Sequence, residues 1–111
     1  MSDNHSQQHD NLIAELWREH QAASFPKGFQ GMDVNGIDFV MLDADIAGCV
    51  SVFLRRGTLD VWRTAVLGLC YRNCEYVIPI LNEAGAEYFW RLGRLAELVL
   101  KAVLKMERPT A

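Results

Sequence analysis

The sequence lacks a long apolar run, and this bears on its relation to membranes. Its longest nearly apolar stretch, from Ile46 to Leu54, is interrupted by Gly48 and Ser51. A membrane-spanning helix needs about 20 predominantly apolar residues in succession. The first ten residues carry no Lys or Arg, and no apolar segment of the kind found in secretory signals follows them. We therefore expect a cytoplasmic protein that does not have a membrane as a partner.

Cysteine and histidine are scarce, which restricts catalysis and metal binding. Cys49, Cys70 and Cys74 are an odd number that cannot pair fully within one chain, and they lack the Cys-x-x-Cys spacing of structural zinc sites. We interpret them as reduced core residues. The chain has three histidines, and two of them precede residue 10. A histidine-dependent triad would therefore have to use the third, His20, which we expect to be partly exposed at a helix end. We predict no metal site, no cofactor and no catalytic residue.

Basic residues are nearly absent from the first half of the chain. Residues 1–54 contain two basic and eight acidic residues, whereas residues 55–111 contain nine basic and six acidic ones, so the halves carry −6 and +3. The isoelectric point is near 5.5, and no basic run or phosphate-binding glycine motif occurs. We therefore do not expect nucleic acid as a partner. The opposite charges fit either early helices packed on later ones or an interface with a partner.

Apolar residues, which make up 50% of the chain, recur at helical spacing in four segments. The segments are residues 11–23, 37–56, 58–81 and 83–106. Between the first two, the prolines and glycines of residues 24–36 predict an irregular loop that packs back on the helices. We predict an all-α, four-helix bundle-like domain with one short helix and three longer antiparallel helices. It should span residues 10–107, and we expect residues 1–9 and 108–111 to be disordered tails.

Capping residues and glycines mark the predicted helix ends and crossings. Gly57 is suited to the left-handed position that ends the second helix, and Pro79 should bend or tighten the end of the third. The predicted N-caps of the first, third and fourth helices are Asp10, Thr58 and Asn82. Glycine lowers helix stability relative to alanine, so the glycines within helices are expected at close helix crossings; they are Gly48, Gly68 and Gly93.

Residues 37–43 are compatible with two conformations. Ile37, Phe39 and Met41 alternate with other residues in a pattern that also fits a short strand. We prefer a helix that begins at Ile37, because a lone strand would have no partner. A shorter helix with Asp43 as its N-cap is the alternative.

Acidic residues cluster around this segment. The sequence DVNGID resembles a calcium-binding loop only superficially, because its glycine falls at the fourth position instead of the sixth. In a helix, Asp38 and Asp45 would share one face, two turns apart. They form either a solvated stripe or one wall of a pocket under the loop. The candidate binding residues, including two that could oppose such a wall, are Asp33, Asp38, Asp43, Asp45, Tyr88 and Arg91.

The predicted last helix is apolar around more than half of its circumference. A helix at the surface of a monomeric bundle needs an apolar stripe of only a little over 100°. Either this helix is central within one chain, or it buries its surplus apolar surface against a second copy. We prefer a homodimer formed by the last two helices, with candidate interface residues Trp62, Tyr76, Phe89, Trp90 and Leu98.

These features favour binding over catalysis. We predict a non-enzymatic binding or regulatory module that acts through a protein–protein interface, with a homodimer as the preferred state. Its acidic face could neutralise a basic protein partner such as a toxin. The alternative is a small-ligand-binding protein or enzyme with a pocket between the 24–36 loop and the third and fourth helices, which a filled core would disfavour. A structural subunit of a larger assembly is the third possibility.

Overall fold

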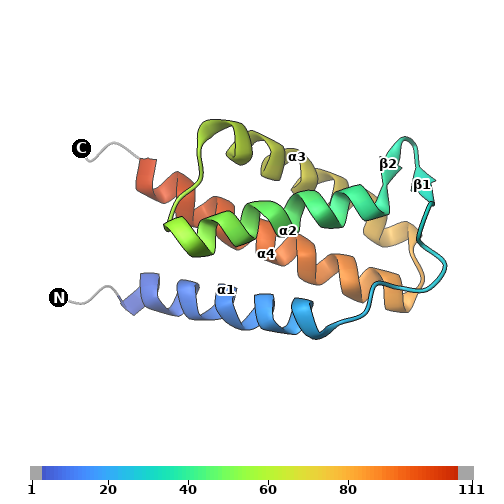
Figure 1. The fold of residues 1–111 in the computed structure, drawn as a ribbon, viewed down its shortest axis with the longest axis horizontal. Coiled ribbons are helices and arrows are strands. Elements are labelled where there is room, and N and C mark those ends of the chain that lie inside the picture. Colours follow the sequence, from blue (N-terminus) through green and yellow to red (C-terminus); the bar gives the residue numbers. More distant parts are fainter. Residues whose placement is uncertain (1–3, 108–111) are drawn as a thin grey trace.

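The computed structural model describes residues 4–107, and these form four packed helices with a small hairpin (Figure 1). The predicted all-α, bundle-like fold is confirmed, and the two-stranded hairpin is an addition to it. The elements are α1 (Asn4–Ala22), β1 (Asp33–Val34), β2 (Ile37–Asp38), α2 (Phe39–Arg56), α3 (Val61–Val77), the 3₁₀ turn η1 (Ile78–Ile80) and α4 (Glu83–Glu107). No helix among residues 4–107 is long and apolar enough to cross a bilayer.

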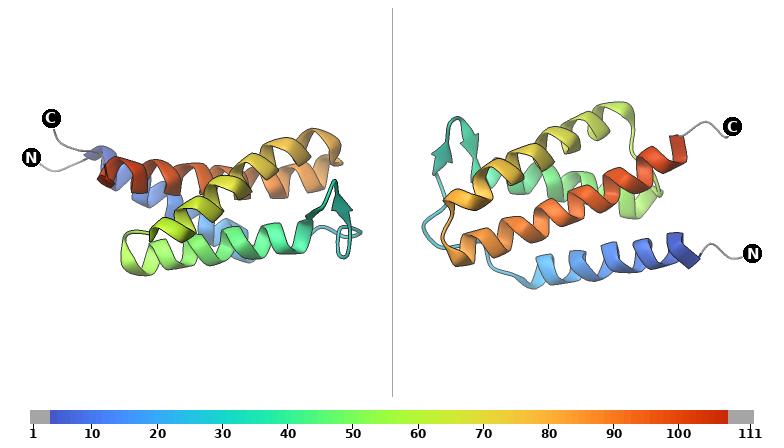
Figure 2. Two further views of the ribbon diagram at one scale, coloured as in Figure 1. Left: turned by 90° about the horizontal axis from the view of Figure 1, so that it is seen from above. Right: turned by 180° about the vertical axis from the view of Figure 1, so that it is seen from behind.

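Helix α4 is the centre of the bundle. It packs against α1, α2 and α3, and α1 and α3 lie on opposite sides of it (Figures 1 and 2). Helices α2, α3 and α4 run in alternating directions, as predicted. The buried side chains of α4 are Tyr88, Phe89, Leu92, Leu95, Ala96, Leu98, Val99 and Val103. The wide apolar surface of this helix is therefore covered largely within one chain, and it does not by itself require a second copy.

Helix α1 begins earlier than predicted. It starts at Asn4, so residues 4–9, which we assigned to a disordered tail, are helical, and Asp10 lies inside the helix instead of capping it. With 19 residues, α1 is therefore not the short helix of the bundle that we expected. Adding residues to an existing helix gains one hydrogen bond for each residue fixed, so a polar, Gln-containing segment can extend α1 without an apolar stripe. Residues 1–3 and the tail predicted at 108–111 lie outside the described residues.

The start of α2 differs from the prediction because strand β2 does have a partner. Val34 pairs with Ile37 in an antiparallel hairpin. Asn35 and Gly36 have φ values of 50° and 83°, which suits the two-residue turn that Asn-Gly forms between paired strands. Asp38 is the N-cap of α2, because its side chain accepts a hydrogen bond from the Met41 N–H at 2.9 Å. Both predicted starts of this helix, at Ile37 and after Asp43, are therefore wrong.

The turn between α2 and α3 confirms one predicted cap and corrects another. Gly57 adopts φ 78° and its N–H donates to the Phe53 carbonyl at 2.7 Å, as expected of a left-handed C-cap. Thr58 does not cap α3. Leu59 is buried, and α3 begins after it with Asp60 as N-cap, whose carboxylate accepts from the Arg63 N–H at 2.7 Å. The burial of Leu59 lengthens the connection and moves the cap by two residues.

The junction between α3 and α4 follows the prediction. Pro79 lies in η1, the 3₁₀ turn that tightens the end of α3. Asn82 caps α4, because its side-chain oxygen accepts from the Gly85 N–H at 2.8 Å. Local capping chemistry thus sets the start of the longest helix.

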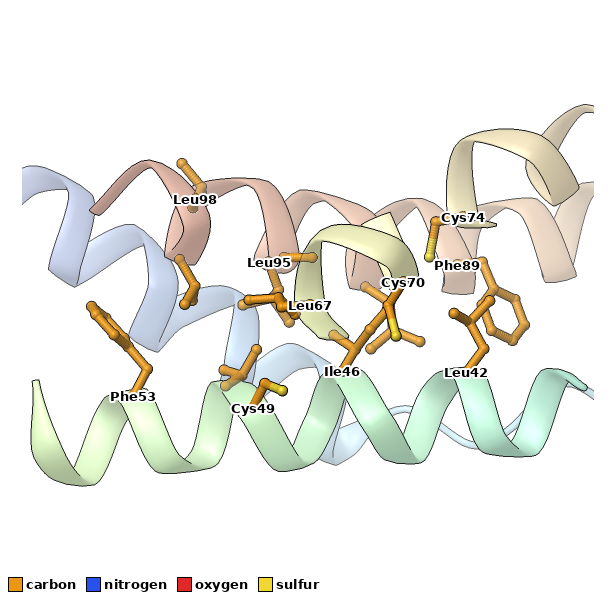
Figure 3. Packing of buried hydrophobic residues seen from close by; sticks show 14 of the residues in the cluster. Leu42, Ile46, Cys49, Phe53, Leu67, Cys70, Cys74, Phe89, Leu95 and Leu98 are labelled. Atoms are coloured by element: carbon orange, nitrogen blue, oxygen red, sulfur yellow. The ribbon is translucent and has the colours of Figure 1, made fainter. Parts of the chain in front are cut away.

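The core lies between α4 and the other three helices. Side chains of α2, among them Leu42 and Ile46, extend toward α3 and α4 in Figure 3. All three cysteines are buried and free, as predicted; they are Cys49, Cys70 and Cys74. Gly93 permits close packing of α3 and α4, since a Cβ there would lie 3.3 Å from the Cys74 Cβ. The same expectation is wrong for Gly48 and Gly68, where a Cβ would have no neighbour within 4 Å.

The loop between α1 and β1 packs on α4, as predicted. Phe25 packs edge-to-face against Tyr88 with ring centroids 5.5 Å apart, and Phe29 packs in the same way against Phe39 with centroids 5.4 Å apart. A Cβ added to Gly85 would lie 2.9 Å from the Phe29 ring. Aromatic side chains therefore fill the space between the loop and α4, which is one part of the region where we considered a ligand pocket.

Candidate functional site

A hydrogen-bonded group on one side of α2 joins three helices. His20 of α1 contacts Asp43 of α2 through Nε2 and Oδ1 at 3.0 Å, and the Tyr88 hydroxyl of α4 donates to Asp43 Oδ2 at 2.6 Å. His20 and Tyr88 are 7% and 6% exposed. Trp17 stacks on the His20 ring with centroids 5.9 Å apart. We call these three hydrogen-bonded residues, His20, Asp43 and Tyr88, the Asp43 cluster.

The chemistry of the Asp43 cluster suits structure more than catalysis. Burial raises the pKa of Tyr88, the hydrogen bond to Asp43 raises it further, and the Arg91 charge lowers it only in part. The hydroxyl is therefore a stable hydrogen-bond donor at neutral pH. The Asp43 carboxylate accepts at both of its oxygens. Each of the three side chains thus serves to hold its helix against the other two.

The environment of His20 differs from the one predicted for it. His20 is buried instead of partly exposed, and its Nδ1, like Nε of Arg91, is buried without a hydrogen-bond partner among the described residues. A usable signal was present in the sequence, because His20 lies seven residues after Ile13 and shares its helix face. Ile13 is fully buried.

The four candidate aspartates do not form one acidic face. Asp38 precedes α2 and caps it, so it does not share a helix face with Asp45. Asp43 contacts α1 and α4, Asp33 is exposed in β1, and Asp45 is exposed on another side of α2. Of the candidate binding residues, the structure joins Asp43 to Tyr88 by a part-buried hydrogen bond.

A groove of about 810 Å³ lies on that other side, between α2 and the start of α3. Ala44, Asp45, Gly48 and Arg55 line it from α2, and Val61, Trp62, Arg63 and Val66 line it from α3. Val61 and Trp62 are 80% and 76% exposed. Asp60 and Arg63 form an ion pair with each other at 2.5 Å. We call this feature the α2–α3 groove.

The candidate interface residues divide into two groups. Trp62, Tyr76 and Trp90 are exposed, whereas Phe89 and Leu98 are 0% and 2% exposed and belong to the core of this chain. The last two are therefore excluded as surface contacts of the folded chain. They were misassigned because α4 is covered by helices on several sides. Leu69, exposed midway between Trp62 and Tyr76, continues the outward apolar row of α3.

The thiols offer little nucleophilic chemistry. Burial raises the pKa of Cys70 to about 11 and that of Cys74 to about 12, and it also raises the pKa of Cys49. These thiols are protonated at neutral pH, and the thiolate is the reactive form. Within residues 4–107, no three His, Cys, Asp or Glu side chains are placed to hold a metal ion.

No protein family, curated protein or solved structure gives a significant match to this chain. Its function is therefore inferred from its own geometry.

Proposed function

We propose that this protein is a non-enzymatic binding module whose α2–α3 groove receives a helix of a protein partner. One observation carries the proposal: Val61 and Trp62, at 80% and 76% exposure, stand beside a groove of about 810 Å³. Exposed apolar side chains gathered at a concave surface are typical of interaction sites, and tryptophan is enriched among residues that dominate binding energy.

The shape of the groove suits a helix. Its walls are two successive helices, and helical partners commonly lay an apolar face into such grooves. Ala44 and Gly48 keep the α2 wall low, and no atom lies within 4 Å of the place where a Gly48 Cβ would stand. A partner backbone can therefore approach α2 closely there.

The remainder of the molecule supports binding over catalysis. The Asp43 cluster satisfies its carboxylate internally, and the buried thiols are protonated. Phe25 and Phe29 fill the α4 side of the region predicted for the alternative ligand pocket, which leaves that alternative only the cavity of about 470 Å³ between Asn35 and α3. A basic partner at a common acidic face has less support, because Asp43 and Asp45 lie on different sides of α2.

Site-specific photo-crosslinking tests this proposal. A photoreactive residue at position 61, in the groove, is compared with one at Glu19, an exposed position on α1. We expect a discrete protein adduct from position 61 whose cross-linked peptide maps to one helical segment. Equal adduct formation at the two positions, or none at position 61, contradicts the proposal.

A matched pair of tryptophan variants strengthens the same test. With the photoreactive residue at position 61, Trp62→Ala should lower the affinity for the partner, and with it the adduct yield, by about thirtyfold, since truncating a binding hot spot costs about 2 kcal/mol. Trp90→Ala removes another exposed tryptophan, outside the groove. It should leave the yield unchanged.

A further inference from the structure

The α2 wall of the groove carries one acidic and one basic side chain toward its opposite ends. Asp45 and Arg55 both line the groove and are both exposed. They lie ten residues apart in the sequence, or about 15 Å along the helix. Neither forms an ion pair within the part of the chain that the structure describes. Both charges are therefore free to meet a partner.

This arrangement is complementary to an antiparallel copy of itself. Consider a twofold axis that crosses α2 midway between Asp45 and Arg55. It places Asp45 of each chain opposite Arg55 of the other chain, so the dimer contains two such pairs of opposite charges. We infer that the helix received by the groove is α2 of a second copy of this chain. This inference rests on the proposed function and adds the identity of the partner.

The apolar contacts fit the same twofold arrangement. Because α3 starts where α2 ends, Trp62 lies near the Arg55 end of the groove. The twofold axis therefore brings Trp62 of one chain to the low wall formed by Ala44 and Gly48 of the other. A large flat side chain then covers the place where small residues leave room.

The inference also gives the charge asymmetry of the sequence a physical role. Among residues 4–107, no ion pair joins an acidic residue of the first half to a basic residue of the second half. Ion pairs within one chain therefore do not explain why residues 1–54 carry a net charge of −6 and residues 55–111 one of +3. Asp45 belongs to the acidic half and Arg55 to the basic half, so the dimer joins them across two chains.

Charge exchange at these two positions is the decisive experiment. Asp45→Arg places two arginines opposite each other at both contacts, and Arg55→Asp places two aspartates there. Each variant alone should weaken the dimer at least about tenfold in sedimentation equilibrium, because like charges at an interface are repulsive. Mixing the two variants should restore association to within about threefold, because every contact in the mixed dimer pairs opposite charges. Loss of folding cannot produce such a recovery.

A pair of glycine variants tests the apolar contact. Gly48→Leu fills the space that Trp62 of the second copy would cover, whereas Gly68→Leu adds the same side chain to α3 outside the groove. A Cβ meets no atom within 4 Å at either position, so both variants should fold. We expect Gly48→Leu to be monomeric and Gly68→Leu to associate like the wild type.

Three results overturn the inference. They are a wild-type chain that is monomeric at micromolar concentrations, charge variants that associate as the wild type does, and a mixture that does not recover. If the chain is monomeric but position 61 cross-links to a helix of a different protein, the identity of the partner is wrong and the proposed function stands. If position 61 gives no adduct, both are wrong.

Discussion

Asp43 and Asp45 lie two residues apart in α2, yet the structure uses them differently. Asp43 faces α1 and α4, where His20 and Tyr88 occupy both of its oxygens. Asp45 lines the open groove between α2 and α3 and has no ion pair among the described residues. One side of α2 is therefore closed and satisfied, and the other is open.

Polar groups on the two sides of α2 therefore differ in role. Those on the closed side hold helices together, and those on the open side are available to bind a partner. On the closed side, removing a polar group leaves its partners buried without hydrogen bonds, which is costly. On the open side, water replaces a lost contact at little cost. Stability should therefore respond to changes near Asp43, and association should respond to changes near Asp45.

The largest expected effect comes from comparing the two aspartates directly. Asp43→Ala leaves His20 and Tyr88 buried without their shared acceptor, so we expect a loss of about 2–4 kcal/mol in the free energy of unfolding. Asp45→Ala should change it by no more than about 0.5 kcal/mol. Urea unfolding of both variants measures this. Equal losses would show that the two sides of α2 do not differ as described.

Two glycines extend the comparison to packing. Gly85→Ala brings a Cβ to 2.9 Å from the Phe29 ring, which Phe39 holds in place, so we expect a loss of about 2 kcal/mol. Gly48→Ala meets no atom within 4 Å and should gain about 0.5–1 kcal/mol, because alanine favours the helix. Thermal or urea unfolding shows whether each variant is less or more stable than the wild type. A loss of stability in Gly48→Ala would contradict the statement that this side of α2 is open.

The thiols predict how stability depends on pH. Burial raises the pKa of Cys74 from its ordinary value of 9.0 to about 12, so the unfolded chain releases this proton at lower pH than the native protein. The resulting stability is fully present below pH 9 and is lost as the pH rises toward 12. At pH 10 the loss is about 1.4 kcal/mol.

Urea unfolding at pH 7 and pH 10 measures this effect. Cys74→Ala, although less stable at pH 7 because of the cavity it creates, should lose less stability between the two pH values than the wild type. Cys49→Ala, at the groove, should reduce the pH dependence less, since the pKa of Cys49 is raised by a smaller amount. Identical pH profiles for all three proteins would contradict the assignment.

The smallest expected effect concerns the cap at the edge of the groove. Asp60→Ala removes the acceptor for the first turn of α3 and should lower the urea midpoint of unfolding. Thr58→Ala should change stability by less than about 0.5 kcal/mol, because Thr58 does not cap the helix. If urea unfolding shows a larger loss of stability for Thr58→Ala than for Asp60→Ala, Thr58 is the N-cap of α3 instead.

Much of the fold was predictable because its signals are local. Gly57, Pro79 and Asn82 act within one or two turns of their own positions, and the structure confirms each of them. The hairpin was missed although Asn35 and Gly36 were visible, because the strand before them was taken for loop. The correct N-cap of α3 was missed because it depends on the burial of Leu59 in the core.

The candidate site was less predictable because it depends on the directions of side chains. The sequence named Asp43, Asp45 and Tyr88 but gave no means of separating the two aspartates into different environments. It named Trp62 and Phe89 together as interface residues, although the structure leaves Trp62 exposed and buries Phe89 fully. A wide apolar helix looks the same in a sequence whether its own chain or a second chain covers it.

The sequence by itself determined the helical class, the antiparallel order of the last three helices, some of their ends and the uneven distribution of charge. These properties follow from hydrophobic periodicity and capping, which act over a few neighbouring residues. Only the tertiary structure decided that α4 is central, that His20 and Tyr88 satisfy Asp43, and that Asp45 and Trp62 remain open beside a groove. Those facts depend on which helix covers which face, and that choice minimises the exposed apolar surface and the unpaired polar groups of the whole chain.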